Sequence, residues 1–148
     1  MSSLATALPA FGTLLKVGDG NSPETFYTIA GVRDIDGPGT SVDEEETTSH
    51  STSSPHRTFA PTLIDDGEIS FEILYQPQHA THSRTSTYGL EYLFQNRLTR
   101  SFRIVVPDPS LTTREFDGFV KEFGEEYPVD GLIMRQVTIR FASAPTYI

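Results

Sequence analysis

The sequence predicts a mainly β protein, with an antiparallel sheet and one short α-helix packed on it. Apolar and polar residues alternate with period two along several segments of the chain, as they do in strands with one buried and one solvated face. Turn signals rich in Gly, Asp and Asn separate these segments. The length suits a single domain that spans residues 1–148.

Two N-terminal segments begin the predicted sheet. Residues 12–17 and 26–35 have short strand patterns, and the Gly-Asp-Gly-Asn sequence at 18–21 is a turn signal between them. Residues 1–11 precede the first strand, and we interpret them as an N-terminal arm.

A long polar segment follows at residues 37–61. It contains ten Ser or Thr residues and four consecutive acids, Asp43 to Glu46. A segment of this length without regular structure is uncommon in a compact domain and is typically functional or disordered. Because it has too few apolar residues to bury itself, we expect it to stay mobile until a partner orders it, and an identical subunit is the simplest partner.

Three further segments have strong strand patterns, at residues 68–75, 100–106 and 132–141. The side chains that we expect to face inward are Ile69, Phe71, Ile73, Tyr75, Phe102, Ile104, Val106, Ile133, Val137, Ile139 and Phe141. The side chains that we expect on the polar face include Glu68, Ser70, Glu72, Gln136, Thr138 and Arg140. Turn signals at 65–67 and 129–131 bound these strands, and the second joins the last two strands.

Residues 87–97 predict the helix. Leu90, Leu93, Phe94 and Arg97 fall at helical spacing, and Thr87 is available as the N-cap.

Residues 114–127 give conflicting signals. Phe116, Phe119, Val120 and Phe123 have the spacing of a helix face. Gly118 and Gly124 oppose a helix, because each costs up to about 1 kcal/mol inside one. We interpret the segment as a strand with a bulge near Gly118, which also explains the change of parity.

The composition limits the function. The net charge is −9, from 20 acids against 11 bases. Such a chain is poorly suited to binding nucleic acid, whose affinity comes mainly from Lys and Arg on phosphates. The charge fits either simple solubility or a surface that avoids DNA. The chain has no Cys, no apolar run of membrane-spanning length and no secretory signal pattern, so we expect a soluble protein made in the cytosol, without contact with a membrane.

Motifs for catalysis or cofactor binding are missing from the sequence. It has no phosphate-binding glycine loop, no HExxH and no GxSxG. We therefore expect no enzyme activity, no catalytic residues and no cofactor.

The histidines and acids do not form a convincing metal site either. His50, His56, His79 and His82 lack the further rigid ligands that zinc requires, so we interpret them as ordinary surface or loop histidines. Asp34, Asp36, Gly39 and Glu45 match four positions of a calcium loop. Pro38 stands where an oxygen ligand belongs, however, and no helices flank the loop. We expect no metal.

The order of the segments resembles a known family. The segments are GTLLK (12–16), YTIAGV (27–32), DGPGT (36–40), FAPTLIDDGEISF (59–71), YQP (75–77), RIVVPD (103–108), FDGFV (116–120) and VTIR (137–140). Their joint order and spacing resemble the major tail tube proteins of phages with long, non-contractile tails (siphovirus-type). The resemblance extends from about residue 10 to about residue 145.

The resemblance implies an antiparallel β-sandwich or barrel-like domain with one short flanking α-helix. It also implies a structural virion protein of the phage tail that is assembled in the host cytoplasm. Its partners would be identical subunits in hexameric rings, whose sheets join into an inner β-barrel and which stack into a hollow tube. Further partners would be the tape-measure, terminator and distal tail proteins. DNA would pass through the lumen during ejection without specific binding.

Two groups of residues become candidates within this interpretation. We expect the long loop to contact the next ring or subunit through Thr40, Asp43, Glu44, Glu45, Glu46, His56, Arg57 and Phe59. We expect an acidic lumen that repels phosphate to be lined by Glu68, Glu72, Glu122, Glu125, Gln136 and Thr138. The alternative for the second group is that it only solvates an outer face.

Three other functions remain open at this point. The first is a tail terminator or distal tail adaptor ring, which shares the fold but does not stack. The second is the tube protein of a bacterial injection machine. The third is a monomeric β-sandwich that binds sugar or peptide through clustered exposed aromatics, for which Tyr88, Tyr92 and Tyr127 are available.

Overall fold

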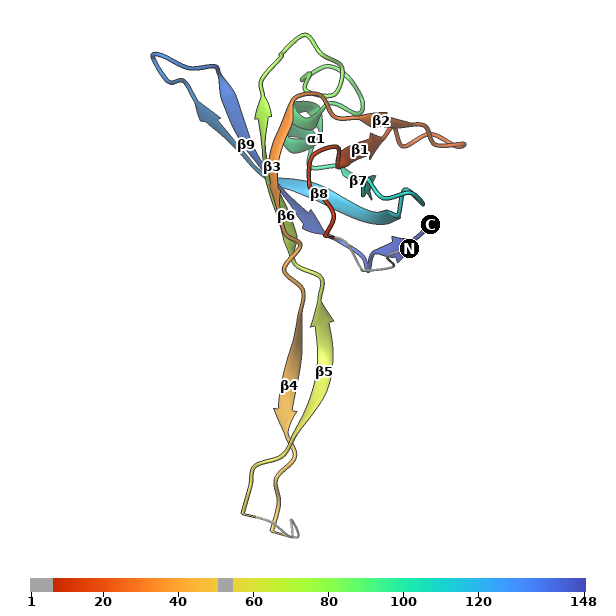
Figure 1. Cartoon of the computed structure of the whole chain (residues 1–148), viewed down its shortest axis with the longest axis vertical. Coiled ribbons are helices and arrows are strands. Elements are labelled where there is room, and N and C mark those ends of the chain that lie inside the picture. The colour runs from red at the N-terminus through yellow and green to blue at the C-terminus, as the bar shows by residue number, and fades with distance from the viewer. Residues whose placement is uncertain (1–6, 51–54) are drawn as a thin grey trace, which may run out of the picture.

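The structure, a computed structural model, describes residues 7–50 and 55–148, and in these residues it is mainly β with one short helix. The strands are β1 (Leu14–Gly18), β2 (Phe26–Thr28), β3 (Val32–Asp36), β4 (Ser41–Glu46), β5 (Phe59–Asp65), β6 (Glu68–Leu74), β7 (Thr99–Val105), β8 (Thr113–Glu126), β9 (Met134–Phe141) and β10 (Thr146–Tyr147), and the helix is α1 (Leu90–Asn96). An eight-stranded antiparallel sheet forms the body, and β4 and β5 form a separate two-stranded arm (Figure 1). The predicted fold class is confirmed.

The body sheet has the strand order β2-β1-β7-β8-β9-β6-β3, with β10 added to β8. β2 and β3 therefore lie at opposite edges, although only residues 29–31 separate them in the sequence. The four Cα–Cα steps from Thr28, the last residue of β2, to Val32, the first residue of β3, span no more than roughly 14 Å. The sheet must therefore curl until its two edges approach each other, which gives the barrel-like shape.

β8 is the strand at which the sheet turns. Its first half pairs with β7, from Val105↔Thr113 to Thr99↔Phe119. Its second half pairs with β9, from Gly118↔Phe141 to Glu126↔Met134. Side chains from both halves meet in one core, which includes a row of stacked rings with centroid distances of 5.7 Å (Phe102–Phe116) and 3.9 Å (Phe116–Phe141).

The alternation in β6 and β9 positions the core as predicted, with two exceptions. Ile69, Phe71 and Ile73 are buried, as are Val137, Ile139 and Phe141. Ile133 was expected inside, but it precedes β9 and is 46% exposed. The first inward position of β9 is instead held by a charged residue, Arg135, which is buried.

β8 confirms the strand interpretation of residues 114–127, but the predicted position of the bulge is wrong. The register shifts between Val120 and Glu122, not at Gly118. The extra residue lets both Val120 and Phe123 face the core, whereas Phe119 turns to the opposite face. The apparent helical spacing is thus a consequence of the bulge.

The helix is shorter than predicted, and its N-cap is Gly89 rather than Thr87. Gly89 is extended (φ −75°, ψ 139°) and no side chain caps the helix. A Cβ at Gly89 would collide with the carbonyl oxygen of Ser83, so the close approach of the preceding loop requires glycine there. Leu90 and Leu93 form the buried face.

The segment at 37–61 was expected to lack structure, and this expectation is wrong for its described part. β4 and β5 pair as a hairpin that projects from the body (Figure 1). Beyond the strands, the amide of Thr47 donates to the carbonyl of Thr58 at 2.7 Å. A polar composition does not prevent strand pairing, because the backbone supplies the hydrogen bonds and β3 and β6 hold both ends. Residues 1–6 of the expected N-terminal arm and residues 51–54 of the loop lie outside the described residues.

Candidate assembly surfaces

The contact and lumen candidates singled out from the sequence, with the exception of Glu125, fall on two surfaces. The first, called the arm, is the β4–β5 hairpin and its flanks. The second, called the polar face, is the outward side of β6, β9 and the second half of β8.

The arm is solvent-exposed along its whole length. Val42 pairs with Ile64, Glu44 with Pro61 and Glu46 with Phe59. In the described part of the chain, β4 and β5 pair only with each other, so the outer edges of both strands are free. A two-stranded hairpin is marginally stable in water by itself. Free edges and exposed apolar side chains both indicate a segment that is covered by another chain.

Acidic side chains dominate one strand of the arm. Asp43 and Glu45 alternate with Glu44 and Glu46 along β4. The ion pair between Arg57 and Glu46 is 3.8 Å long, and both side chains are well exposed, so it contributes little to stability. The arm combines negative charge with exposed Val42, Phe59, Leu63 and Ile64.

Five of the six candidate lumen residues lie together on the polar face. Glu72 is opposite Gln136, whose Nε2 donates to Glu72 Oε1 at 2.9 Å. Glu122 is opposite Thr138 because the bulge restores the outward direction of its side chain. The Nζ of Lys121 lies 3.2 Å from Oε2 of Glu68.

Glu125 does not share this face. It is opposite Arg135 in the register and forms an ion pair of 3.1 Å with it on the inward side of the sheet. The bulge is the reason, since it places Glu122 and Glu125 on opposite sides of β8 despite the simple alternation around them.

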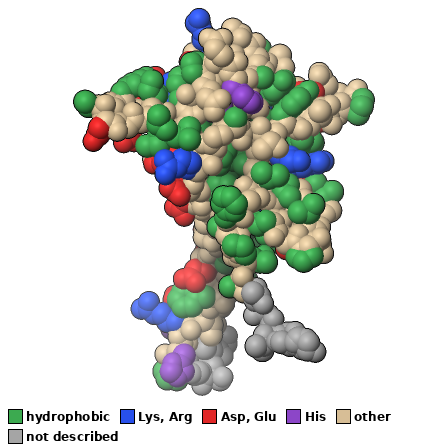
Figure 2. All heavy atoms as spheres, turned by 45° about the horizontal axis from the view of Figure 1, so that its top comes forward, with side chains coloured by type: hydrophobic (Ala, Val, Ile, Leu, Met, Phe, Trp, Pro, Cys, Tyr) green, Lys and Arg blue, Asp and Glu red, His purple; other side chains and the backbone are tan. Residues whose placement is uncertain are grey.

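The polar face includes further charges, and sequence reasoning missed those that come from β3. Asp36 is opposite Ser70, and Arg33 is opposite Glu72. Arg140 Nη2 contacts Asp65 Oδ1 at 2.9 Å. The Gly67 amide and then Arg140 hold the pKa of Asp65 below its ordinary value. Acidic and basic side chains gather on one flank of the body above the arm (Figure 2). The sequence places Asp36 at the end of a predicted strand, which could have suggested a position on the sheet. Asp36 lies opposite Ser70 of β6, however, only because the register of β3 shifts between Arg33 and Asp36.

A buried cation stabilises the inner side of this sheet. The guanidinium of Arg135 lies 3.9 Å from the ring centroid of Phe123 and 4.7 Å from that of Tyr75. Its Nε donates to the carbonyl of Gly124 at 3.1 Å. The hydroxyl of Tyr75 donates to Glu91 in α1 at 2.7 Å, and burial and then Glu91 raise the pKa of Tyr75.

His82 is not the surface histidine that the sequence suggested. It is completely buried; its Nε2 lies 2.6 Å from the carbonyl of Ala30, and its Nδ1 accepts from the Gln76 amide at 3.0 Å. These partners require the neutral tautomer with the proton on Nε2. Burial lowers the pKa of His82, the carbonyl of Ala30 opposes this, and His79 lowers it further. In the described part of the chain, no group of three or more His, Asp or Glu side chains could hold a metal ion.

The tyrosines proposed for a ligand-binding module are dispersed. Tyr88 stacks on Tyr27 with ring centroids 4.0 Å apart. Tyr88 and Tyr92 both pack against the core, whereas Tyr127 is exposed at the β8–β9 turn. They do not form the exposed aromatic cluster that sugar or peptide binding requires.

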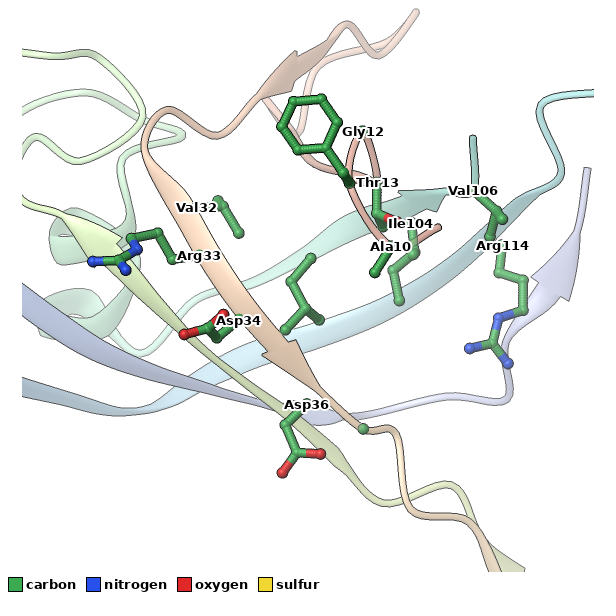
Figure 3. Close-up of a pocket in the computed structure, with 13 residues that line it drawn as sticks. Ala10, Gly12, Thr13, Val32, Arg33, Asp34, Asp36, Ile104, Val106 and Arg114 are labelled. Atoms are coloured by element: carbon green, nitrogen blue, oxygen red, sulfur yellow. The ribbon is translucent and has the colours of Figure 1, made fainter. Parts of the chain in front are cut away.

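A groove of about 970 Å³ opens beside the edge strand β3, between β3 and residues 10–13. Val32, Arg33 and Ile104 are among the residues that line it, and the side chain of Arg33 points away from that of Val32 (Figure 3). A second open edge lies on β8, because β7 pairs with β8 only as far as Phe119. In the described part of the chain, the second half of β8 is therefore an unpaired strand edge in addition to the two terminal strands of the sheet, β2 and β3.

The helix of the described structure is too short and too polar to cross a membrane.

The comparisons with known proteins agree with each other. The family model of the lambda phage tail tube protein (TTP) matches residues 12–147. No curated protein matches the sequence significantly.

Several solved structures share the fold at low sequence identity. A chain in the virion of a native gene transfer agent particle superimposes with a TM-score of 0.73 at 16% identity, covering 96% of this chain and 99% of that one. A chain of the sheath–tube complex of an extracellular contractile injection system, PVC, in the extended state gives a TM-score of 0.69 at 11% identity, with coverage of 100% and 98%. The SPP1 tail tube gives a TM-score of 0.68 at 12% identity, with coverage of 94% and 78%.

Proposed function

Because the chain belongs to the lambda phage tail tube protein family, we propose that it forms hexameric rings that stack into the hollow tube of a phage tail. It is a structural, tube-forming virion protein of the tail. The ring number, the contacts and the role of each surface are our proposal.

Two open strand edges of the body carry the proposal. The terminal strand β3, and the second half of β8 on the side that β7 does not reach, leave backbone N–H and C=O groups without a strand partner in the described structure. Unpaired edges of this kind are a hazard for a monomer, and ring closure removes them. Apposing β3 of one subunit to the second half of β8 of its neighbour would make one continuous barrel from six identical chains.

The polar face would then line the lumen. Glu68, Glu72 and Glu122 lie on it with Gln136 and Thr138. Carboxylates in a confined channel repel phosphate, so DNA would pass without binding. Glu125 faces inward, where it pairs with Arg135, so we do not include it in the proposed lining.

The arm would join successive rings. It projects from the body, has two free edges and carries exposed apolar and acidic residues. Head-to-tail contacts of this kind are heterologous and continue without closure, as a tube requires. The candidate contact residues Thr40, Asp43, His56 and Phe59 lie along the arm or its flanks.

The remaining partners follow from the role of a tube. The tape-measure, terminator and distal tail proteins would contact its interior and its ends, and assembly would take place in the host cytoplasm. Neither the polar face nor the arm presents a catalytic arrangement, so we propose a purely structural role without cofactor or membrane contact.

Negative-stain electron microscopy of the concentrated protein, with size-exclusion chromatography and light scattering, tests the proposal. We expect six-fold rings and hollow tubes. Six-fold rings that never stack would instead support a terminator or adaptor ring. A protein that stays monomeric even when mixed with a preformed distal tail complex would contradict the proposal.

A further inference from the structure

The turn between β8 and β9 is an exposed apolar tip. Tyr127, Val129, Leu132 and Ile133 lie within the seven residues that join the strands, and all four are exposed; Val129 reaches 105% relative exposure. We call this set the tip. An exposed group of large apolar side chains at the end of a hairpin marks a contact surface.

A second apolar group lies where the arm leaves the body. Val42, Leu63 and Ile64 are exposed, and Val42 pairs with Ile64 one position from the Ser41↔Asp65 pair that begins the arm. We call these three residues the arm base. The distal part of the arm is more polar, with Thr47 and Thr58 facing each other.

The tip and the arm project toward opposite ends of the long axis of the molecule (Figure 1). The tip of one molecule therefore does not cover its own arm base. In a stack of identically oriented subunits, the tip end of one ring faces the arm end of the next. A second copy of this chain is the partner that supplies both surfaces in equal numbers.

We propose that the tip of each subunit packs onto the arm base of a subunit in the adjacent ring. This inference rests on the proposed stacking of rings and identifies the two surfaces that meet between one ring and the next. The contact is heterologous, since the tip meets the arm base and never another tip, and it repeats along the tube without closing.

The charges around the contact determine whether salt favours or opposes tube formation. Glu126 and Asp130 flank the tip, while Asp43 flanks the arm base. Acids on both sides repel each other when the surfaces meet, and salt screens that repulsion while leaving the apolar contact intact. Raising the ionic strength is therefore expected to lower the protein concentration at which tubes form.

Cysteine pairs test the contact directly, because the chain contains no Cys. The test variant carries Leu63→Cys and Val129→Cys, and preformed tubes are treated with a short bis-maleimide cross-linker. We expect a ladder on a denaturing gel at multiples of the chain mass of 16.4 kDa. The matched control carries Val129→Cys and Leu111→Cys; Leu111 is also exposed but lies in the β7–β8 turn, and this pair should give no ladder.

The outcomes separate this inference from the proposed function. Tubes of the test variant that give no ladder would overturn the tip contact while leaving the tube itself intact. Dimers from Val129→Cys alone would show a tip-to-tip contact and would also overturn it. If the wild-type protein forms neither rings nor tubes with a distal complex, both proposals fail.

A second pair of variants tests the same contact without cross-linking. Val129→Ser with Leu132→Ser removes apolar surface from an exposed turn, so the monomer should fold normally by circular dichroism. We expect the concentration needed for tube formation to rise at least tenfold. Leu111→Ser should leave it unchanged, and an equal effect of both variants would overturn the proposal.

Discussion

The guanidinium of Arg135 lies 3.9 Å above the ring of Phe123, on the strand next to its own, and both side chains face the interior of the sheet. Tyr75, which directly follows β6, lies against the same guanidinium, and its hydroxyl donates to Glu91 in α1. One cation thereby connects β8, β9, the end of β6 and the helix. Its planar group satisfies the Gly124 carbonyl and still stacks on two rings.

Replacing Arg135 with Lys should destabilise the monomer although it keeps the charge. Lysine has no planar group to stack between the rings, so we expect the free energy of unfolding to fall by about 1–2 kcal/mol. Urea denaturation of the monomer measures the change. Arg57→Lys, on the exposed arm, is the control and should have no effect. Equal stability of the two variants would contradict a role for stacking.

Two glycines of β8 provide a matched test of close packing between strands. A Cβ at Gly118 would lie 2.8 Å from the carbonyl oxygen of Arg140, whereas a Cβ at Gly124 would lie 3.6 Å from Gln136 Cβ, which is ordinary contact. Gly118→Ala should therefore cost roughly 1–3 kcal/mol through strain. Gly124→Ala should be neutral or slightly stabilising, because alanine restricts the unfolded chain. Thermal and urea unfolding of both variants would show whether the order is reversed.

The buried His82 predicts a pH dependence of stability above the range where carboxylates titrate. Burial lowers the pKa of His82 below 6.5 in the folded state, so the unfolded chain takes up the proton first as the pH falls. Stability should therefore be complete above about pH 7 and decline below pH 6.5, with a slope of at most about 1.4 kcal/mol per pH unit.

Urea unfolding between pH 7.5 and 5.5 measures this slope. His82→Gln should lower stability at pH 7.5 and flatten the slope, whereas His56→Gln on the arm should leave the slope unchanged. A slope that persists in His82→Gln would assign it to other groups.

Reversing charge on the polar face should affect DNA passage without affecting assembly. Glu68→Lys with Glu72→Lys would attract phosphate inside the lumen, so virions built from this variant should contain normal tails and eject DNA more slowly. Glu68→Gln with Glu72→Gln removes the charge without reversing it and should slow ejection less. The rate of DNA release after receptor addition is measured for wild-type virions and for virions of each double variant. Identical kinetics would show that these side chains do not face the channel.

Shortening the arm should separate ring formation from stacking. Replacing residues 42–64 by an Asn-Gly turn removes the paired part of the arm and leaves the body sheet intact. We expect rings by light scattering and electron microscopy, but no tubes. Tubes of normal length from this variant would exclude the arm from stacking.

The sequence predicted the parts of the fold that depend on local alternation. β6 was correct in its bounds to within one residue and in its buried face, because the polar residues Glu68, Ser70 and Glu72 alternate with the apolar residues Ile69, Phe71 and Ile73. The polarity of the face with Glu68 and Glu72 was correct for the same reason. The family could also be identified from the order of short segments, although no single segment was specific.

The errors have a common physical origin, which is pairing between distant segments. Simple alternation does not show that the bulge lies at Lys121–Glu122, and this bulge decides which side Glu125 faces. The charge of Arg135 predicts an exposed side chain, and its burial becomes favourable only through stacking on the rings of Tyr75 and Phe123. The arm was missed because its strands are stabilised by pairing with each other and by anchorage to β3 and β6, not by a buried face.

The three-residue connection between β2 and β3 has a mechanical consequence. Ile29 is buried in the core, the Ala30 amide donates to Thr81 and its carbonyl accepts from His82, so the connection is fixed at both ends and in the middle. In the proposed tube, a pull along the circumference would reach each subunit at β3, whose first residue, Val32, directly follows this connection. Separating β3 from β6 would therefore also pull on the buried connection and on the β1–β2 ladder at the opposite edge of the sheet. We expect β3 to resist such a pull more than a strand held by a single ladder would.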